Sequence, residues 1–75
     1  MSNIEITKRF IMNRKDIGFF KAILESYEEI AIFSVLDGER GLIEVIYPSN
    51  FEDDVTSIMS DMAQYEIFFQ EVHDV

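Results

Sequence analysis

The sequence contains no cysteine, no tryptophan, and only one proline and three glycines among its 75 residues. The lack of cysteine excludes disulfide bonds, thiolate zinc sites, thiol redox pairs and cysteine nucleophiles. The scarcity of proline and glycine, with a hydrophobic content of 48% and an aromatic content of 13%, is not typical of disordered or fibrous chains. We therefore expect a single packed domain over residues 1–75, without a covalent cross-link.

Positive charge is also scarce, because six basic residues stand against fifteen acidic ones and the formal net charge is −9. An acidic surface repels nucleic acid phosphates and anionic membranes, so neither is an expected partner. Residues 1–20 lack the long apolar run of a signal peptide or membrane span, which makes the cytoplasm the expected location. The charge is uneven: residues 1–21 carry +3 (five basic, two acidic) and residues 22–75 carry −12 (one basic, thirteen acidic).

Hydrophobic periodicity predicts four strands. Apolar and polar residues alternate over Ile4–Met12, which is typical of a half-buried strand, although Lys8 falls on the apolar face. Residues 30–36 and 42–47 are rich in β-branched and aromatic residues, and the turn between them contains two glycines, so they predict a hairpin. A short last strand is expected over residues 67–72.

Two further segments have apolar residues at helical spacing. Asn13 is expected to cap the first helix, and Ser49 with Glu52 forms a Ser-x-x-Glu capping box that opens the second, just after Pro48 ends a strand. The apolar residues of each helix lie on one face. They are Ile17, Phe19, Phe20, Ile23, Leu24 and Tyr27 in the first helix and Phe51, Val55, Ile58, Met59 and Met62 in the second. The order βαββαβ predicts an α+β, ferredoxin-like fold: a four-stranded antiparallel sheet with two helices on one face.

The predicted strands are apolar on both faces, whereas a sheet face in contact with water usually alternates to polar. One assignment places Phe33, Val35, Val45, Tyr47, Ile67 and Phe69 inward and leaves Ile30, Ile32, Leu36, Leu42, Ile46, Phe68 and Val72 outward. The opposite assignment leaves a similar excess. Each such side chain contributes roughly 1.5–3 kcal/mol when fully buried, and a contiguous exposed patch usually marks an interface. The alternative is that these are single exposed apolar residues, which are common on any protein surface.

We therefore expect a homodimer, or a complex with another protein, that joins through sheet faces or strand edges. A domain of this size gains much of its stability from a partner. The candidate interface residues are Ile32, Leu36, Leu42, Ile46, Phe68 and Val72.

Arg14 and Lys15 are expected in the first turn of the first helix, where positive charge opposes the helix dipole. A bound anion would relieve this conflict, because free backbone N–H groups and neighbouring cations together form an anion site. Asn13, Arg14 and Lys15 are therefore the candidate binding residues for a small anionic ligand. The alternative is that both cations are solvated and pair with carboxylates such as Asp16.

No set of residues typical of catalysis or metal binding is recognisable. His73 is the only histidine, and with Glu71 and Asp74 it has too few neighbours for a metal site or a triad. The serines have no general base in an interpretable position. We therefore expect no enzymatic activity, no catalytic residue, no metal and no cofactor.

The run from Asp16 to Tyr27, followed by Ala31-Ile32 and by the turn Asp37–Gly41 with Leu42, resembles an uncharacterised domain-of-unknown-function family of short bacterial proteins. In topology the chain also resembles the ACT regulatory domains, which are ferredoxin-like modules that bind amino acids at subunit interfaces. Asn13-Arg14-Lys15 takes the place of their glycine between the first strand and the first helix.

Together with the apolar strands and the misplaced cations, this resemblance implies a non-enzymatic regulatory or ligand-sensing module. Such a module would act as a homo-oligomer and bind a small anionic metabolite. The alternative is an interaction subunit or adaptor that docks onto a different protein through its open sheet face.

Overall fold

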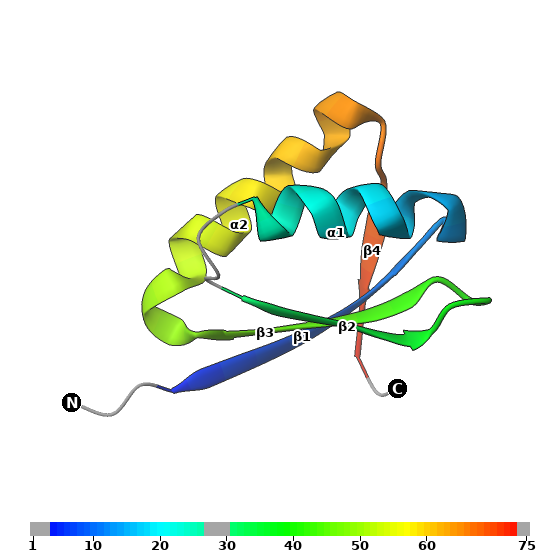
Figure 1. Cartoon of the computed structure of the whole chain (residues 1–75). Coiled ribbons are helices and arrows are strands. Elements are labelled where there is room, and N and C mark those ends of the chain that lie inside the picture. The colour runs from blue at the N-terminus through cyan, green and yellow to red at the C-terminus, as the bar shows by residue number, and fades with distance from the viewer. Residues whose placement is uncertain (1–3, 27–30, 74–75) are drawn as a thin grey trace.

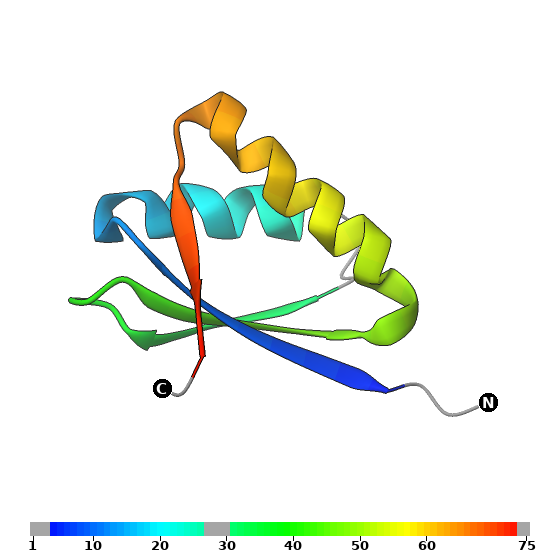
Figure 2. The same cartoon turned by 180° about the vertical axis from the view of Figure 1, so that it is seen from behind.

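The computed structural model describes residues 4–26 and 31–73 and has the predicted βαββαβ order (Figure 1). Four strands form one antiparallel sheet in the order β2-β3-β1-β4. In both side views the two helices lie above the sheet, and no element of the described chain lies beneath it (Figures 1 and 2). The fold is therefore the α+β, ferredoxin-like arrangement that the periodicity predicts.

The four strands lie close to their predicted positions. They are β1 (Glu5–Met12), β2 (Ile32–Asp37), β3 (Leu42–Pro48) and β4 (Phe69–Val72). Pro48 is the last residue of β3, opposite Glu5, where the strand ends and a missing N–H matters least. The predicted start of β4 was wrong, because Ile67 and Phe68 precede the strand. Ile30, predicted at the start of β2, lies outside the described residues.

The strand register identifies the face of the sheet that the helices cover. Val45 pairs with Lys8 on one side and with Phe33 on the other, and directly opposed residues point to the same side of a sheet. Val45 and Tyr47 are both buried. The assignment that placed them inward is therefore the correct one, and Lys8 does lie on the helix-covered face.

The hydrophobic core fills the space between this face and the two helices. Its buried members are Phe10, Met12, Phe20, Leu24, Ile43, Val45, Tyr47, Val55, Ile58, Met59, Met62 and Ile67. The predicted apolar faces of both helices are confirmed, except that Phe19 is exposed and packs edge-on against Tyr65 at 5.4 Å between ring centroids. Tyr27 lies outside the described residues.

Helix α1 (Ile17–Glu25) begins later than predicted. The 3₁₀ turn Arg14–Asp16 precedes it, and Asn13 caps that turn, because its side-chain oxygen accepts a hydrogen bond from the backbone N–H of Lys15 at 3.1 Å. The prediction that Arg14 and Lys15 occupy the first turn of α1 was therefore wrong. The capping role of Asn13 is confirmed, but for the turn and not for the helix.

Helix α2 (Glu52–Asp61) follows a 3₁₀ turn over Ser49–Phe51, and the predicted capping box was wrong. The backbone N–H of Ser49, which Glu52 would have to bind, donates to the carbonyl oxygen of Ile4 at 2.7 Å. The Glu52 carboxylate faces the sheet instead, where it accepts hydrogen bonds from two side chains of the sheet. A contact between distant parts of the chain has thus replaced a local one.

Glu66 ends the 3₁₀ turn that follows α2 with φ at 61°, in the left-handed region. This conformation costs a residue with a Cβ atom roughly 1–2 kcal/mol, and glycine adopts it freely. Glu66→Gly should therefore raise the free energy of unfolding by about 0.5–1 kcal/mol, after the greater entropy of glycine in the unfolded chain is taken into account. Urea denaturation measures this. Glu66→Ala, which removes the carboxylate and keeps the strain, should not stabilise, and a less stable glycine variant would contradict the prediction.

Candidate functional site

The three candidate anion-binding residues lie together on one exposed turn. Asn13, Arg14 and Lys15 are all exposed, and the Asn13 side chain is already engaged by the Lys15 backbone. Because the two cations precede α1, they oppose its dipole less directly than the sequence suggested. The anion site stays a prediction.

The candidate interface residues divide into three groups by exposure. Ile32, Leu36 and Phe68 are exposed, at 63%, 47% and 69%, whereas Ile46 and Val72 are half-buried. Leu42 is buried, although its place in the register puts it on the side away from the helices, between Ile11 and Asp37. It therefore adds no exposed area to the candidate interface.

The face of the sheet away from the helices is called here the open face. It consists of Thr7, Arg9, Ile11, Ile32, Ser34, Leu42, Glu44, Ile46, Gln70 and Val72, with Glu5, Asp37 and Pro48 at its rim. Ile32 and Ile46 are directly opposed on neighbouring strands. Arg9 and Glu44 are opposed on β1 and β3, and the Arg9 Nε atom donates to the Glu44 carboxylate at 2.9 Å. The centre of the open face thus contains apolar side chains and the ion pair between Arg9 and Glu44, whose charges compensate each other.

Two features make the sheet edges poorer interfaces than the open face. The outer strand β2 has a register shift between Val35 and Asp37, which disturbs its ladder at Leu36. The other outer strand, β4, has only four residues. Bulges and short strands at an edge hinder the addition of a further strand.

A hydrogen-bonded cluster ties α2 to the helix-covered face of the sheet. The Lys8 ammonium group donates to one Glu52 oxygen at 3.1 Å, and the Tyr47 hydroxyl donates to the other at 2.7 Å. These bonds raise the pKa of Lys8, chiefly through Glu52, and lower the pKa of Glu52, chiefly through Tyr47 and then Lys8. Burial first, and then the bond to Glu52, raise the pKa of Tyr47 to about 12. Lys8, which interrupted the apolar pattern of its strand, therefore has a partner 44 residues away.

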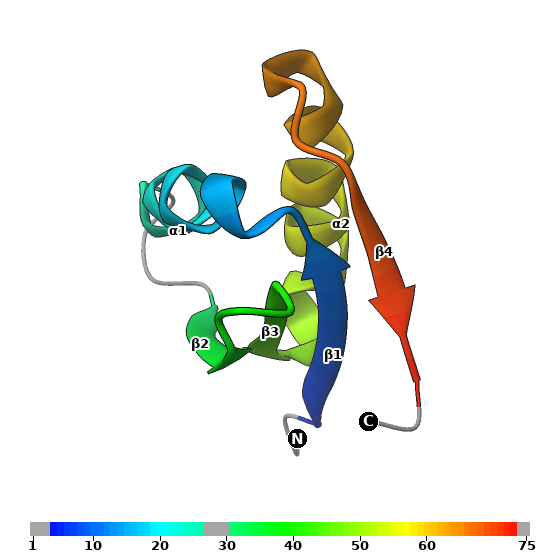
Figure 3. The same cartoon turned by 90° about the vertical axis from the view of Figure 1, so that its right-hand side faces the viewer.

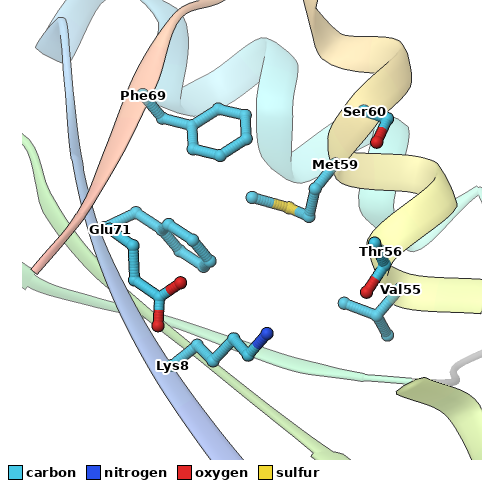
Figure 4. A pocket seen from close by; sticks show the side chains of 8 residues that line it. Lys8, Val55, Thr56, Met59, Ser60, Phe69 and Glu71 are labelled. Carbon is cyan, nitrogen blue, oxygen red and sulfur yellow. The ribbon is translucent and has the colours of Figure 1, made fainter. Parts of the chain in front are cut away.

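A cavity is lined by residues of β1, β4 and α2. In Figure 3, β4 and α1 lie on opposite sides of α2. The volume of the cavity is about 230 Å³, and it is lined by Lys8, Phe10, Val55, Thr56, Met59, Ser60, Phe69 and Glu71. The Phe69 ring and the Met59 thioether point into it from opposite sides (Figure 4). The Phe10 and Phe69 rings meet edge to face, with centroids 5.2 Å apart.

Sequence reasoning missed this cavity because it depends on the register of β4. Phe10 and Met59 follow the apolar periodicity of their strand and their helix. Glu71 joins them only because it stands opposite Phe10 on the helix-covered face. The one available signal was Lys8, a charged residue at an apolar position of its strand.

Metal sites and membrane spans have no counterpart in residues 4–26 and 31–73. Within these ranges, no three His, Cys, Asp or Glu side chains gather in a way that could hold a metal ion. The His73 Nε2 atom lies 3.8 Å from the Glu71 carboxylate, and its side chain is 78% exposed. In the same part of the chain, the helices are too short or too polar to cross a membrane.

Comparison with known proteins yields a family match. A family model described as "Domain of unknown function (DUF4911)" matches residues 10–65, which include α1, β2, β3 and α2. No curated protein and no solved structure matches the chain. The predicted resemblance to a domain-of-unknown-function family is confirmed, and the resemblance to ACT domains stays a prediction.

Proposed function

The chain belongs to the DUF4911 family, a domain of unknown function, and we propose that it is a non-enzymatic regulatory module that acts as a homodimer through its open face. One observation carries the proposal: Ile32 is 63% exposed and stands beside half-buried Ile46 on a face that no described element covers. Covering these side chains removes apolar surface from water, and each contributes roughly 1.5–3 kcal/mol when fully buried.

A second copy of the chain suits this face because of its charges. Two molecules that each carry −9 repel one another, so a contact between them needs a surface whose centre has no uncompensated charge. Arg9 and Glu44 provide this at the centre of the open face, where they form an ion pair. In a twofold contact each copy presents the same patch, so Arg9 of one copy can also approach Glu44 of the other.

Ile32→Glu tests this function. The substitution adds charge to the most exposed apolar residue of the open face. The dissociation constant of the dimer should therefore rise at least tenfold, because a buried unpaired carboxylate costs more than about 1.4 kcal/mol. Sedimentation velocity at micromolar concentration measures the oligomeric state. The fold should survive, because the side chain is exposed in the single chain.

Phe19→Glu is the matched control, because it places the same charge on a residue that is 51% exposed on the helix side. This variant should remain dimeric. A wild-type chain that is monomeric at micromolar concentration would contradict the proposal. So would a dimer that Phe19→Glu disrupts and Ile32→Glu leaves intact.

A further inference from the structure

The cavity between β1, β4 and α2 has an apolar floor and a polar rim. Phe10, Val55 and Met59 form its buried part, and the half-buried Phe69 ring closes one side. Four polar side chains complete the lining, and they are Lys8, Thr56, Ser60 and Glu71. A concave apolar surface with a few converging polar groups is the usual form of a small-molecule site.

The two charged groups of the rim differ in whether a partner of opposite charge compensates them. The Lys8 ammonium group is compensated, because it forms an ion pair with Glu52 at 3.1 Å. In Figure 4 it lies toward α2, whereas the Glu71 carboxylate enters the rim from β4. Among the described residues, the basic side chain within ion-pair range of the Glu71 carboxylate is His73, whose Nε2 atom lies 3.8 Å away, beyond hydrogen-bonding distance. Together Lys8, Glu52 and Glu71 carry a formal charge of −1, and the uncompensated charge is that of Glu71.

The two aromatic rings of the cavity also favour a cationic ligand. Phe10 and Phe69 meet at 83°, so the cavity is lined by two rings in different orientations. The face of an aromatic ring attracts cations. The Met59 sulfur, which points into the same space, is a polarizable contact for an apolar body. The net charge of −9 further raises the local concentration of cations around the chain.

We propose that this cavity binds a small organic ammonium ion, with its apolar body on Phe10, Met59 and Phe69 and its charged nitrogen at Glu71. The ligand is small, because about 230 Å³ lies below the roughly 300–1,000 Å³ of sites for drug-sized molecules. The site is separate from the open face, since its residues lie on the helix-covered side of the sheet. It also differs from the anion site predicted at Asn13, Arg14 and Lys15 in both place and sign.

Three probes that share one apolar body test the proposal: 2-phenylethylamine, 2-phenylethanol and 3-phenylpropionate. Their affinities are measured on the full chain by ¹H–¹⁵N chemical shift titration at neutral pH. The amine should bind about fivefold to tenfold more tightly than the alcohol, which is the increment of a partly exposed charge-assisted hydrogen bond. The carboxylate should bind most weakly. The shifts should centre on Phe10, Met59 and Phe69.

Two substitutions that each remove one negative charge distinguish binding at Glu71 from the general attraction of cations to an acidic chain. Glu71→Gln should reduce amine binding to the level of the alcohol and leave alcohol binding unchanged. Glu39→Gln, in the turn between β2 and β3, removes the same charge away from the cavity and should leave the preference for the amine intact. Three outcomes would overturn the proposal: no binding of the amine, equal loss of amine binding in both variants, or tightest binding of the carboxylate with its loss in Lys8→Met.

Discussion

Gly41→Ala is expected to lower the free energy of unfolding by about 3 kcal/mol or more. Gly41 has a φ of +72°, and a Cβ atom built there would overlap the carbonyl oxygen of Met12. The Gly41 carbonyl oxygen accepts a hydrogen bond from the Met12 backbone N–H at 3.0 Å, so the two segments cannot move apart without breaking it. Met12 is buried in the core, and a shift there would disturb the packing of β1.

Such a loss is large for a chain of 75 residues, whose total stability is expected to be about 4–11 kcal/mol. Urea denaturation followed by circular dichroism measures it. Gly38→Ala in the same turn is the matched control, because an added Cβ would lie 3.8 Å from the Val35 side chain, an ordinary contact. That variant should change the stability by less than about 1 kcal/mol. Equal effects of the two substitutions would contradict the explanation.

Gly41 also shows how far the sequence predicts the fold. The turn itself could be predicted, because Asp37 accepts a hydrogen bond from the backbone N–H of Arg40 within four residues of chain. The sequence also predicted the four strands and two α-helices that the structure describes, with some ends displaced, since their apolar periodicity is local. The close approach of Gly41 to Met12 could not be predicted in this way, because it joins residues that are distant along the chain.

The candidate sites show the same difference between local patterns, which could be predicted, and contacts of distant residues, which could not. One of the two face assignments left Ile32 outward, and only the strand register selects that assignment; Leu42 on the same face is buried by its neighbours in the register. The partner of Lys8 was not predictable, because the capping-box pattern assigned Glu52 to Ser49. Local patterns therefore identified which residues of a strand share a face, and the pairing of distant strands decided which face the helices cover and which side chains meet.

The stability of the protein should fall steeply at alkaline pH, and Tyr47 should account for most of this fall. Burial and the hydrogen bond to Glu52 raise the pKa of Tyr47 to about 12, from 10.0 for a free phenol. A group whose pKa is raised on folding stabilises the folded state fully below its unfolded pKa, here pH 10.0, and this contribution is lost as the pH rises to about 12. The loss should be about 2–3 kcal/mol, at roughly 1.4 kcal/mol for each pH unit.

Tyr47→Phe isolates this contribution. At neutral pH the variant should be about 1 kcal/mol less stable, because the 2.7 Å hydrogen bond to Glu52 is missing. Above pH 10 its stability should decline much less than that of the wild type, so the two curves should converge and then cross. A smaller decline should remain, because the pKa of Lys8 is also raised on folding and its contribution is lost in the same direction.

Urea denaturation at a series of pH values up to 12 measures both curves. Tyr65→Phe is the matched control, because it removes the hydroxyl of a tyrosine that is 47% exposed and packs on Phe19. Its stability should decline with pH in parallel with the wild type. If Tyr47→Phe also declined in parallel, the burial of Tyr47 and its hydrogen bond to Glu52 would not be the cause. Convergence of the Tyr47→Phe curve alone would place the alkaline sensitivity where α2 is tied to the sheet.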